Sequence, residues 1–249
     1  MTQPRRTLAL TLAAAALAAT SVLSLAPAAG ATPTVAAAGA PGVPRWATSA
    51  AATAADNAAW GQSTIADLAA TALQQQAAIE SWRQDPVHQG RFVERDPELG
   101  LMVLAYEGTR RQLATEISPS VGVPPDELFA SWQDTTETRR TVVFAALSQV
   151  GVPYRRNASS PRNGFDCSGL TKYAWGTVGI ELAHQDSRQI SASASRTWDS
   201  ARPGDLVQYP GHVMMYLGAG RAIVHAPYTG RDVEVRTMDR NVRLGSPIG

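Results

Sequence analysis

Apolar residues recur at helical spacing in the first half of the chain. Between residues 47 and 82, positions three or four apart form one apolar stripe, which comprises Ile65, Leu68, Ala72, Ile79 and Trp82. Two Asp-Pro pairs interrupt this pattern between residues 85 and 97. A second helix is predicted over roughly 98–117, and it carries Leu101, Leu104, Ala105 and Leu113. Pro125, followed by two acidic residues, suits the first turn of a short third helix that ends near Trp132.

The pattern changes near Asp134, which marks the predicted boundary between a helical region over 47–133 and a second domain over 134–249. The second domain begins with a predicted helix over 138–150, which Gly151 and Pro153 end. Asp166 suits the N-cap of another helix, whose predicted buried positions are Cys167, Leu170, Ala174 and Val178. Short apolar runs then predict strands over 205–209, 212–217, 222–225 and 233–236.

The N-terminal segment has the composition of an export signal. Arg5 and Arg6 precede an apolar stretch from 8 to 25, and small residues follow as far as Ala31. A membrane anchor is the alternative, but many alanines and threonines make the stretch only weakly apolar. We therefore expect a cleaved signal peptide over 1–31, a linker over 32–46 rich in Ala, Gly and Pro, and a secreted or cell-wall location.

Charge and cysteine content exclude some classes of protein. The formal net charge is +1 and becomes about neutral without Arg5 and Arg6, so no basic field points to nucleic acid. Hydrophobic residues make up 44 % of the chain, which is enough to bury a core. Cys167 is the only cysteine, so an internal disulfide is impossible. A lone cysteine is commonly a small buried apolar residue, and only its neighbours assign it a chemical role.

Cys167 falls at the first turn of its predicted helix, where unpaired amides and the helix dipole favour a thiolate and lower its pKa. A nearby imidazole would complete the activation by accepting the thiol proton. His212 and His225 lie on consecutive predicted strands. A loop of two or four residues centred between positions 219 and 220 makes them diagonal neighbours on one face, whereas a three-residue loop separates them. His88 is expected on the surface and His184 is expected to be structural.

Five motifs in this half of the chain resemble those of the NlpC/P60 peptidases, and the match runs from about Arg139 to Met238. The motifs are Gly-Val-Pro-Tyr at 151–154, Phe-Asp-Cys-Ser-Gly-Leu at 165–170, Pro-Gly-Asp-Leu-Val at 203–207, Gly-His-Val at 211–213 with Tyr-Leu-Gly at 216–218, and Val-His-Ala at 224–226. The resemblance implies an α+β fold: a papain-like NlpC/P60 catalytic domain, with helices packed on an antiparallel sheet, preceded by an α-helical N-terminal region.

The resemblance also implies roles for individual residues. It carries the nucleophile onto Cys167, the general base onto His212 and the orienting polar residue onto His225. Tyr154 matches a tyrosine near the oxyanion site, and Asp166 and Ser168 flank the nucleophile as substrate-binding candidates. The family needs no metal or cofactor. One departure is Arg155-Arg156-Asn157, where many members have Trp-Gly-Gly, and these arginines are either contacts for substrate carboxylates or solvated loop residues.

The implied activity is that of a secreted cysteine-type peptidoglycan endopeptidase, cleaving stem peptides between D-γ-glutamate and a diamino acid such as meso-diaminopimelate. Two alternatives remain open, namely an N-acetylmuramoyl-L-alanine amidase of the same fold and a catalytically silent wall-binding protein. We expect a monomer whose helical region over 47–133 is a spacer, a docking element for a protein partner, or an intramolecular mask that limits access to Cys167.

Overall fold

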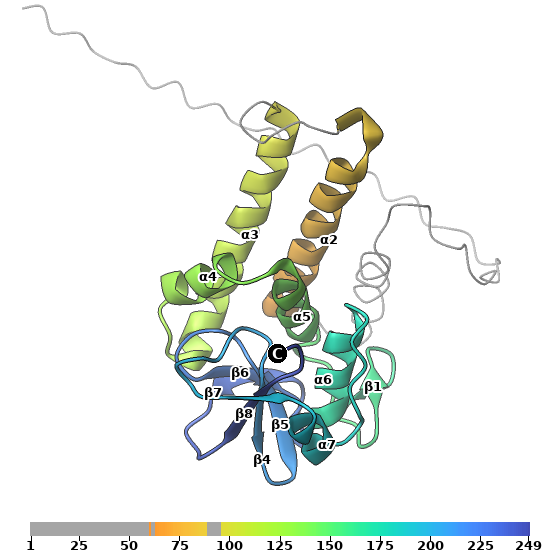
Figure 1. Cartoon of the computed structure of the whole chain (residues 1–249), viewed down its shortest axis with the longest axis vertical. Helices are drawn as coiled ribbons and strands as arrows, with labels where there is room; N and C mark the ends of the chain where they lie inside the picture. Colours follow the sequence, from red (N-terminus) through yellow and green to blue (C-terminus); the bar gives the residue numbers. More distant parts are fainter. Residues whose placement is uncertain (1–59, 61–62, 89–95) are drawn as a thin grey trace, which may run out of the picture. The chain divides into compact units, whose positions relative to one another are not determined.

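The computed structural model describes residues 60, 63–88 and 96–249 (Figure 1). The signal peptide expected over 1–31 and the linker expected over 32–46 lie outside these residues, as does most of the segment from 47 to 62. Within the described part of the chain, no helix is both long and apolar enough to span a membrane.

The helical region consists of α2 (Thr64–Gln84), the short 3-10 helix η1 (Pro86–His88), α3 (Pro97–Val121) and α4 (Pro125–Gln133). Ser63 caps α2 by accepting from the amide of Ala66, and Asp96 caps α3 by accepting from the amides of Glu98 and Leu99. The helices α2 and α3 lie side by side (Figure 1). The sequence-based prediction of successive helices is therefore correct for the residues that the structure describes.

The buried face of α3 differs from the predicted one. Of the four apolar residues that marked this helix, only Leu113 is buried, whereas Leu101 and Leu104 are 69 % and 65 % exposed and Ala105 is also exposed. The buried residues are Leu99, Tyr106, Arg110, Leu113, Ala114, Ile117 and Val121. Because this face includes a tyrosine and an arginine, a search for apolar residues alone places the stripe on the wrong side of the helix.

Helix α5 (Glu137–Leu147) joins the helical region to the rest of the protein. Every residue from Thr141 to Gln149 is buried, which means that the second half of this helix is covered on all sides. Helix α2 packs on α5, and α6 and β5 also contact it. A buried hydrogen bond of 2.8 Å from Gln76 Nε2 to Thr141 Oγ1 joins α2 to α5.

A six-stranded antiparallel sheet has the order β3-β8-β4-β5-β6-β7. Its strands are β3 (Ala194–Arg196), β4 (Leu206–Tyr209), β5 (His212–Tyr216), β6 (Ala222–His225), β7 (Glu234–Thr237) and β8 (Arg243–Ser246). The four predicted strands correspond to β4, β5, β6 and β7, with ends that differ by at most one residue. Strands β3 and β8 were not predicted, because β3 is exposed and polar and neither shows a run of apolar alternation.

The remaining elements are a small two-stranded sheet, β1 (Ser159–Ser160) with β2 (Gly164–Phe165), and two helices, α6 (Cys167–Gly176) and α7 (Asp186–Ser191). Helix α6 packs on β5 and on α5. Of its predicted buried positions, Leu170 and Ala174 are fully buried, Cys167 is half-buried, and Val178 lies beyond the end of the helix. Helices thus pack on an antiparallel sheet, as the α+β prediction requires.

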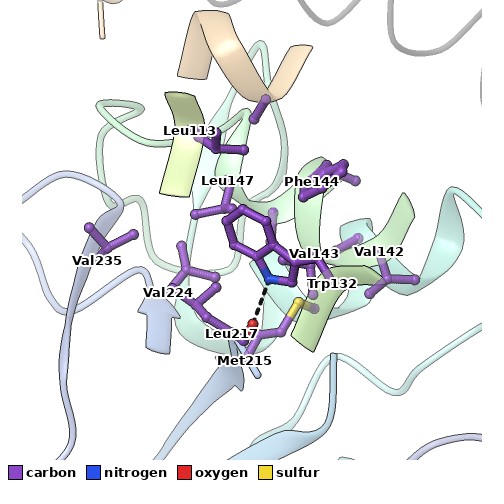
Figure 2. Packing of buried hydrophobic residues seen from close by; sticks show 14 of the residues in the cluster. Leu113, Trp132, Val142, Val143, Phe144, Leu147, Met215, Leu217, Val224 and Val235 are labelled. Carbon is purple, nitrogen blue, oxygen red and sulfur yellow. Dashed lines mark hydrogen bonds between the residues drawn. The ribbon is translucent and has the colours of Figure 1, made fainter. Parts of the chain in front are cut away.

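One hydrophobic cluster contains residues of both the helical region and the sheet, from Ala69 to Val235. Trp132 of α4 is fully buried in it, and its indole Nε1–H donates to the carbonyl of Leu217 at 2.7 Å (Figure 2). A buried ion pair of 2.7 Å between Arg139 of α5 and Asp205, just before β4, fixes the helix against the sheet. The predicted boundary near Asp134 falls between α4 and α5, in the middle of this shared core.

We expect Trp132→Phe to lower the free energy of unfolding by about 1–3 kcal/mol, because the buried Leu217 carbonyl loses its donor while most of the ring volume remains. Urea unfolding followed by circular dichroism measures the change. Trp198→Phe is the matched control, since Trp198 is only half-buried, and a much smaller loss is expected there. Equal losses in the two variants would contradict the importance given to the Trp132 bond.

Candidate active site

Cys167 is the first residue of α6, as predicted, and Asp166 is the N-cap. Two residues after Cys167, position 169 must be glycine, because a Cβ there would lie 2.0 Å from the carbonyl oxygen of Ala158. The loop before β1 therefore presses directly against the first turn of the helix. This close approach fixes the direction in which α6 presents the cysteine.

Asp166 is the centre of a hydrogen-bond network below the cysteine. Its Oδ1 accepts from Gly169 N at 2.7 Å, Ser168 Oγ at 3.1 Å and His184 Nε2 at 2.9 Å, and its Oδ2 accepts from Asn157 N at 2.8 Å. A carboxylate has about four acceptor sites, so this set fills its capacity. Asp166 is thus placed to hold the helix and the loop together, and Ser168 is turned inward to it. His184 is structural in this network, as the sequence suggested.

A tight turn positions His212 at the start of β5. Tyr209 pairs with His212, so that Pro210 and Gly211 form a two-residue connection in which Gly211 has φ of 87°. Proline followed by a glycine with positive φ is the requirement of a type II turn. Asp186 Oδ2 accepts from Gly211 N at 3.1 Å and from Gln208 Nε2 at 3.0 Å, which fixes the turn to α7.

The register of the β5–β6 hairpin brings the two histidines together. Met215 pairs with Val224 and Tyr216 with Ile223, and the same register continued places Met214 opposite His225. The alternative with a three-residue loop is therefore excluded. His212 Nε2 lies 2.8 Å from His225 Nδ1, with the two rings nearly perpendicular at 80°. Both side chains are buried.

The hydrogen bond between the histidines defines their tautomers. His212 Nε2 is occupied by His225, so Nδ1 is the nitrogen available to a substrate or to the thiol. For Nδ1 to accept a proton, Nε2 must carry hydrogen and donate to His225 Nδ1, which places the remaining hydrogen of His225 on Nε2. That atom lies 3.4 Å from Glu234 Oε1, but it is buried and not aligned for a hydrogen bond, so the contact is electrostatic.

The thiol of Cys167 lies beside the strand that carries His212. The backbone amide of Val213, the residue after His212, donates to the sulfur, as does the amide of Ser168. Tyr154 lies near enough for Cys167 and Asp166 to act on its hydroxyl electrostatically, and its backbone N–H donates to the Arg231 carbonyl at 2.8 Å. The structure thus brings together four of the predicted site residues, namely Tyr154, Cys167, His212 and His225.

The pKa of Cys167 is raised rather than lowered, which corrects the prediction from its position on the helix. Burial is the main cause, and the carboxylates of Asp166 and Asp186 add to it, whereas the Val213 and Ser168 amides oppose it only in part. Burial also lowers the pKa of both histidines to about 4, and for His212 the neighbouring His225 adds to this. At neutral pH the site therefore holds a neutral thiol beside a neutral imidazole.

Sequence reasoning missed Asp186, whose charge acts on both Cys167 and His212. It lies in the polar stretch between 183 and 204, which shows no periodicity that would single it out. Asp186 lines a groove of about 530 Å³ together with Ser187, Gln208, Tyr209, Pro210, Gly211, Asn241, Val242 and Arg243. This groove adjoins His212 and is suited to hold part of a substrate. A larger cavity of about 1000 Å³ lies toward the other end of α6, and neither Cys167 nor His212 lines it.

The helical region contacts the second domain away from the cysteine. Its contacts include α5, β7, where Thr237 Oγ1 donates to the Val121 carbonyl, and Leu217. Trp60 also reaches the loop between β1 and β2, where its Nε1–H donates to the Pro161 carbonyl at 2.8 Å. Arg155 and Arg156 are exposed on the loop after Tyr154. Among the residues that the structure describes, no group of His, Cys, Asp and Glu side chains forms a metal site.

We expect iodoacetamide to alkylate Cys167 more slowly at pH 7.5 than it alkylates an unfolded peptide of the same sequence, because the raised pKa reduces the thiolate fraction. The rate should keep rising with pH after that of the peptide has levelled off. Mass spectrometry of the modified protein measures both rates. Faster alkylation of the native protein at neutral pH would show that the site holds a thiolate instead.

Part of the chain is similar to known proteins. Residues 151–243 match the model of the NlpC/P60 family. The chain is similar to peptidoglycan endopeptidase RipA of Mycolicibacterium smegmatis, with 39 % identity over 110 residues, which cover 38 % of this chain and 22 % of that protein. It is also similar to dipeptidyl-peptidase 6 of Lysinibacillus sphaericus, with 39 % identity over 103 residues, which cover 41 % of this chain and 37 % of that protein.

Among solved structures, the P60 domain of an antigen from M. avium subspecies paratuberculosis is 29 % identical, with a TM-score of 0.42, and covers 45 % of this chain and 96 % of that one. The chain thus matches well under half the length of the curated relatives named above. The part of the chain from residue 151 to residue 243 belongs to the NlpC/P60 family.

Proposed function

We propose that this protein is a cysteine peptidase that hydrolyses the stem peptides of peptidoglycan. The observation that carries the proposal is the arrangement of three residues. Cys167 lies at the N-terminus of α6, and its sulfur accepts a hydrogen bond from the backbone amide of Val213, the residue after His212. His212 in turn forms a hydrogen bond with His225. The same three roles of nucleophile, base and orienting group perform acyl transfer on several unrelated folds. The names of the relatives supply the class of substrate.

The reaction begins with the Cys167 thiol and the His212 imidazole both neutral. His212 Nδ1 accepts the thiol proton as the sulfur attacks the scissile carbonyl, and His225 stabilises the resulting imidazolium through the 2.8 Å bond. The Tyr154 hydroxyl is the candidate donor to the oxyanion. Protonated His212 then gives its proton to the leaving amine, which departs and leaves a thioester on Cys167. Water, deprotonated by His212, hydrolyses the thioester and restores the thiol.

We propose that the bond cleaved is the one between D-γ-glutamate and a diamino acid such as meso-diaminopimelate. The groove beside His212 offers one carboxylate, Asp186, and one guanidinium, Arg243, which suit a peptide with free charged groups of both signs. The amidase alternative would use the same nucleophile on a bond next to the sugar. A wall substrate places the protein outside the cytoplasm, in agreement with the signal peptide expected over 1–31.

The cleaved bond is identified by incubating purified cell wall with the protein and analysing the released stem peptides by mass spectrometry. We expect new termini at D-glutamate and at the diamino acid, and no product from Cys167→Ala, because the acyl intermediate cannot form without the sulfur. The variant should unfold at the temperature of the native protein. New N-termini at L-alanine would indicate the amidase, and unchanged wall would indicate the silent wall-binding protein. Products from Cys167→Ala would overturn the proposal.

The two histidines are expected to differ in their effect on the rate. His212→Ala should reduce kcat by about 10²–10⁴-fold, because no other group accepts the thiol proton. His225→Ala should leave a larger residual activity, since it orients His212 and does not touch the reacting atoms. His88→Ala is a control, because His88 stacks on Trp82 in the helical region. Small and equal losses for His212→Ala and His225→Ala would contradict these roles.

A further inference from the structure

An arginine of α3 is buried and forms no salt bridge with the residues that the structure describes, although the charge of Glu107 acts on it. Arg110 is 6 % exposed, and its guanidinium lies 4.4 Å above the Tyr106 ring and 5.2 Å from the Phe129 ring. These aromatic faces attract the cation but accept no conventional hydrogen bond from its edge. Its Nε is buried and has no acceptor among the residues that the structure describes. A buried N–H without an acceptor is costly.

A second guanidinium also has a buried Nε without an acceptor among the described residues. Arg140 of α5 is held in place because its Nη1 donates to the carbonyls of Trp132 at 3.0 Å and Thr135 at 2.7 Å. Its Nε is nevertheless buried without an acceptor in the described part of the chain. Arg110 and Arg140 act on each other electrostatically, so that two like charges share one location. Two unsatisfied donors that belong to adjacent cations require the same kind of group, an anionic acceptor.

Both arginines line one cavity between the helical region and α5. Its volume is about 170 Å³, and its lining residues are Gln76, Ile79, Glu80, Arg83, Val103, Tyr106, Arg110, Glu137 and Arg140. This volume is several times the ~30 Å³ that one water molecule occupies in the liquid. The lining contains three arginines and two glutamates, so its net charge is positive. The cavity is therefore large enough for a group with several oxygen atoms.

We propose that this cavity is a binding site for a small oxyanion, either phosphate or a carboxylate, held by Arg110 and Arg140. The planar guanidinium presents directed N–H groups that match the oxygens of such anions, which a spherical halide matches less well. The Tyr106 hydroxyl donates to Gln76 Oε1 at 2.8 Å, and Gln76 in turn donates to Thr141, so the neighbouring polar groups are already paired. In the described part of the chain, the buried lining donors that lack an acceptor are the Nε–H groups of Arg110 and Arg140.

The position of the site has a consequence for the contact between the helical region and the domain that carries Cys167. Its lining residues come from α2, α3 and α5, so a bound anion contacts both sides of the junction between the helical region and the domain that carries Cys167. An anion that binds only the folded state stabilises that junction by an amount that grows with the logarithm of its concentration once this exceeds the dissociation constant. The inference is independent of the proposed peptidase activity, because it concerns stability and is measured without substrate.

The test is thermal unfolding of the native protein in inorganic phosphate or acetate, at fixed pH and at ionic strength balanced with sodium chloride. For at least one of the two anions, we expect Tm to rise by about 3–5 °C at ten times the dissociation constant and to keep rising with the logarithm of the anion concentration. A response to phosphate identifies a tetrahedral oxyanion, and a response to acetate alone identifies a carboxylate. Isothermal titration calorimetry should give one site per chain.

Two variants isolate the site. Arg110→Met should abolish the response to the anion and should be at least as stable as the native protein in chloride alone, because it removes an unpaired buried charge. Arg111→Met is the matched control, since Arg111 lies on the same helix and over the same Phe129 ring but is exposed and 3.9 Å from Asp126, and it should respond like the native protein. Equal responses in all three proteins, or none in the native protein, would overturn the proposal.

Discussion

The burial of the second half of α5 on every side is the constraint on which the rest of the structure depends. A helix covered all round cannot be stable in a domain that ends at one of its faces. The sheet and α6 cover one side of α5, and the helical region covers the other, with Trp132 and Gln76 forming the polar links. The domain that carries Cys167 and the helices before it therefore share a single core, although only residues 151–243 match the family.

The sequence predicted the helices and strands of the fold better than it predicted which face of each helix is buried. The strands around His212 and His225 were found because buried alternating runs are interrupted by glycine and proline. The buried face of α3 was not found, because Tyr106 and Arg110 occupy it while Leu101 and Leu104 are exposed. Strand β8 was missed for a related reason. It is buried by its neighbours in the sheet, β3 and β4, and such long-range pairing leaves little local signal in four residues.

The identities of the candidate catalytic residues were accessible from the sequence, but their electrostatics were not. The position of Cys167 at a helix start follows from short-range rules, and the structure bears it out. The sequence left two registers of the hairpin open, and the structure has the one that brings His212 and His225 together. The direction of the thiol pKa depends on burial and on Asp186, which lies on a separate helix and reaches the site only through the tertiary fold. The full set of bonds made by Asp166 likewise involves loops at Asn157 and His184 that no local pattern connects to it.

The neutral state of Cys167 has a consequence for the durability of the protein. The thiolate form of cysteine attacks peroxides and disulfides, so a thiol that stays protonated at rest is oxidised slowly. The chain has no second cysteine that could resolve an oxidised sulfur by forming an internal disulfide. Burial that keeps the thiol protonated at neutral pH thus slows the oxidation of a sulfur that the chain itself cannot restore.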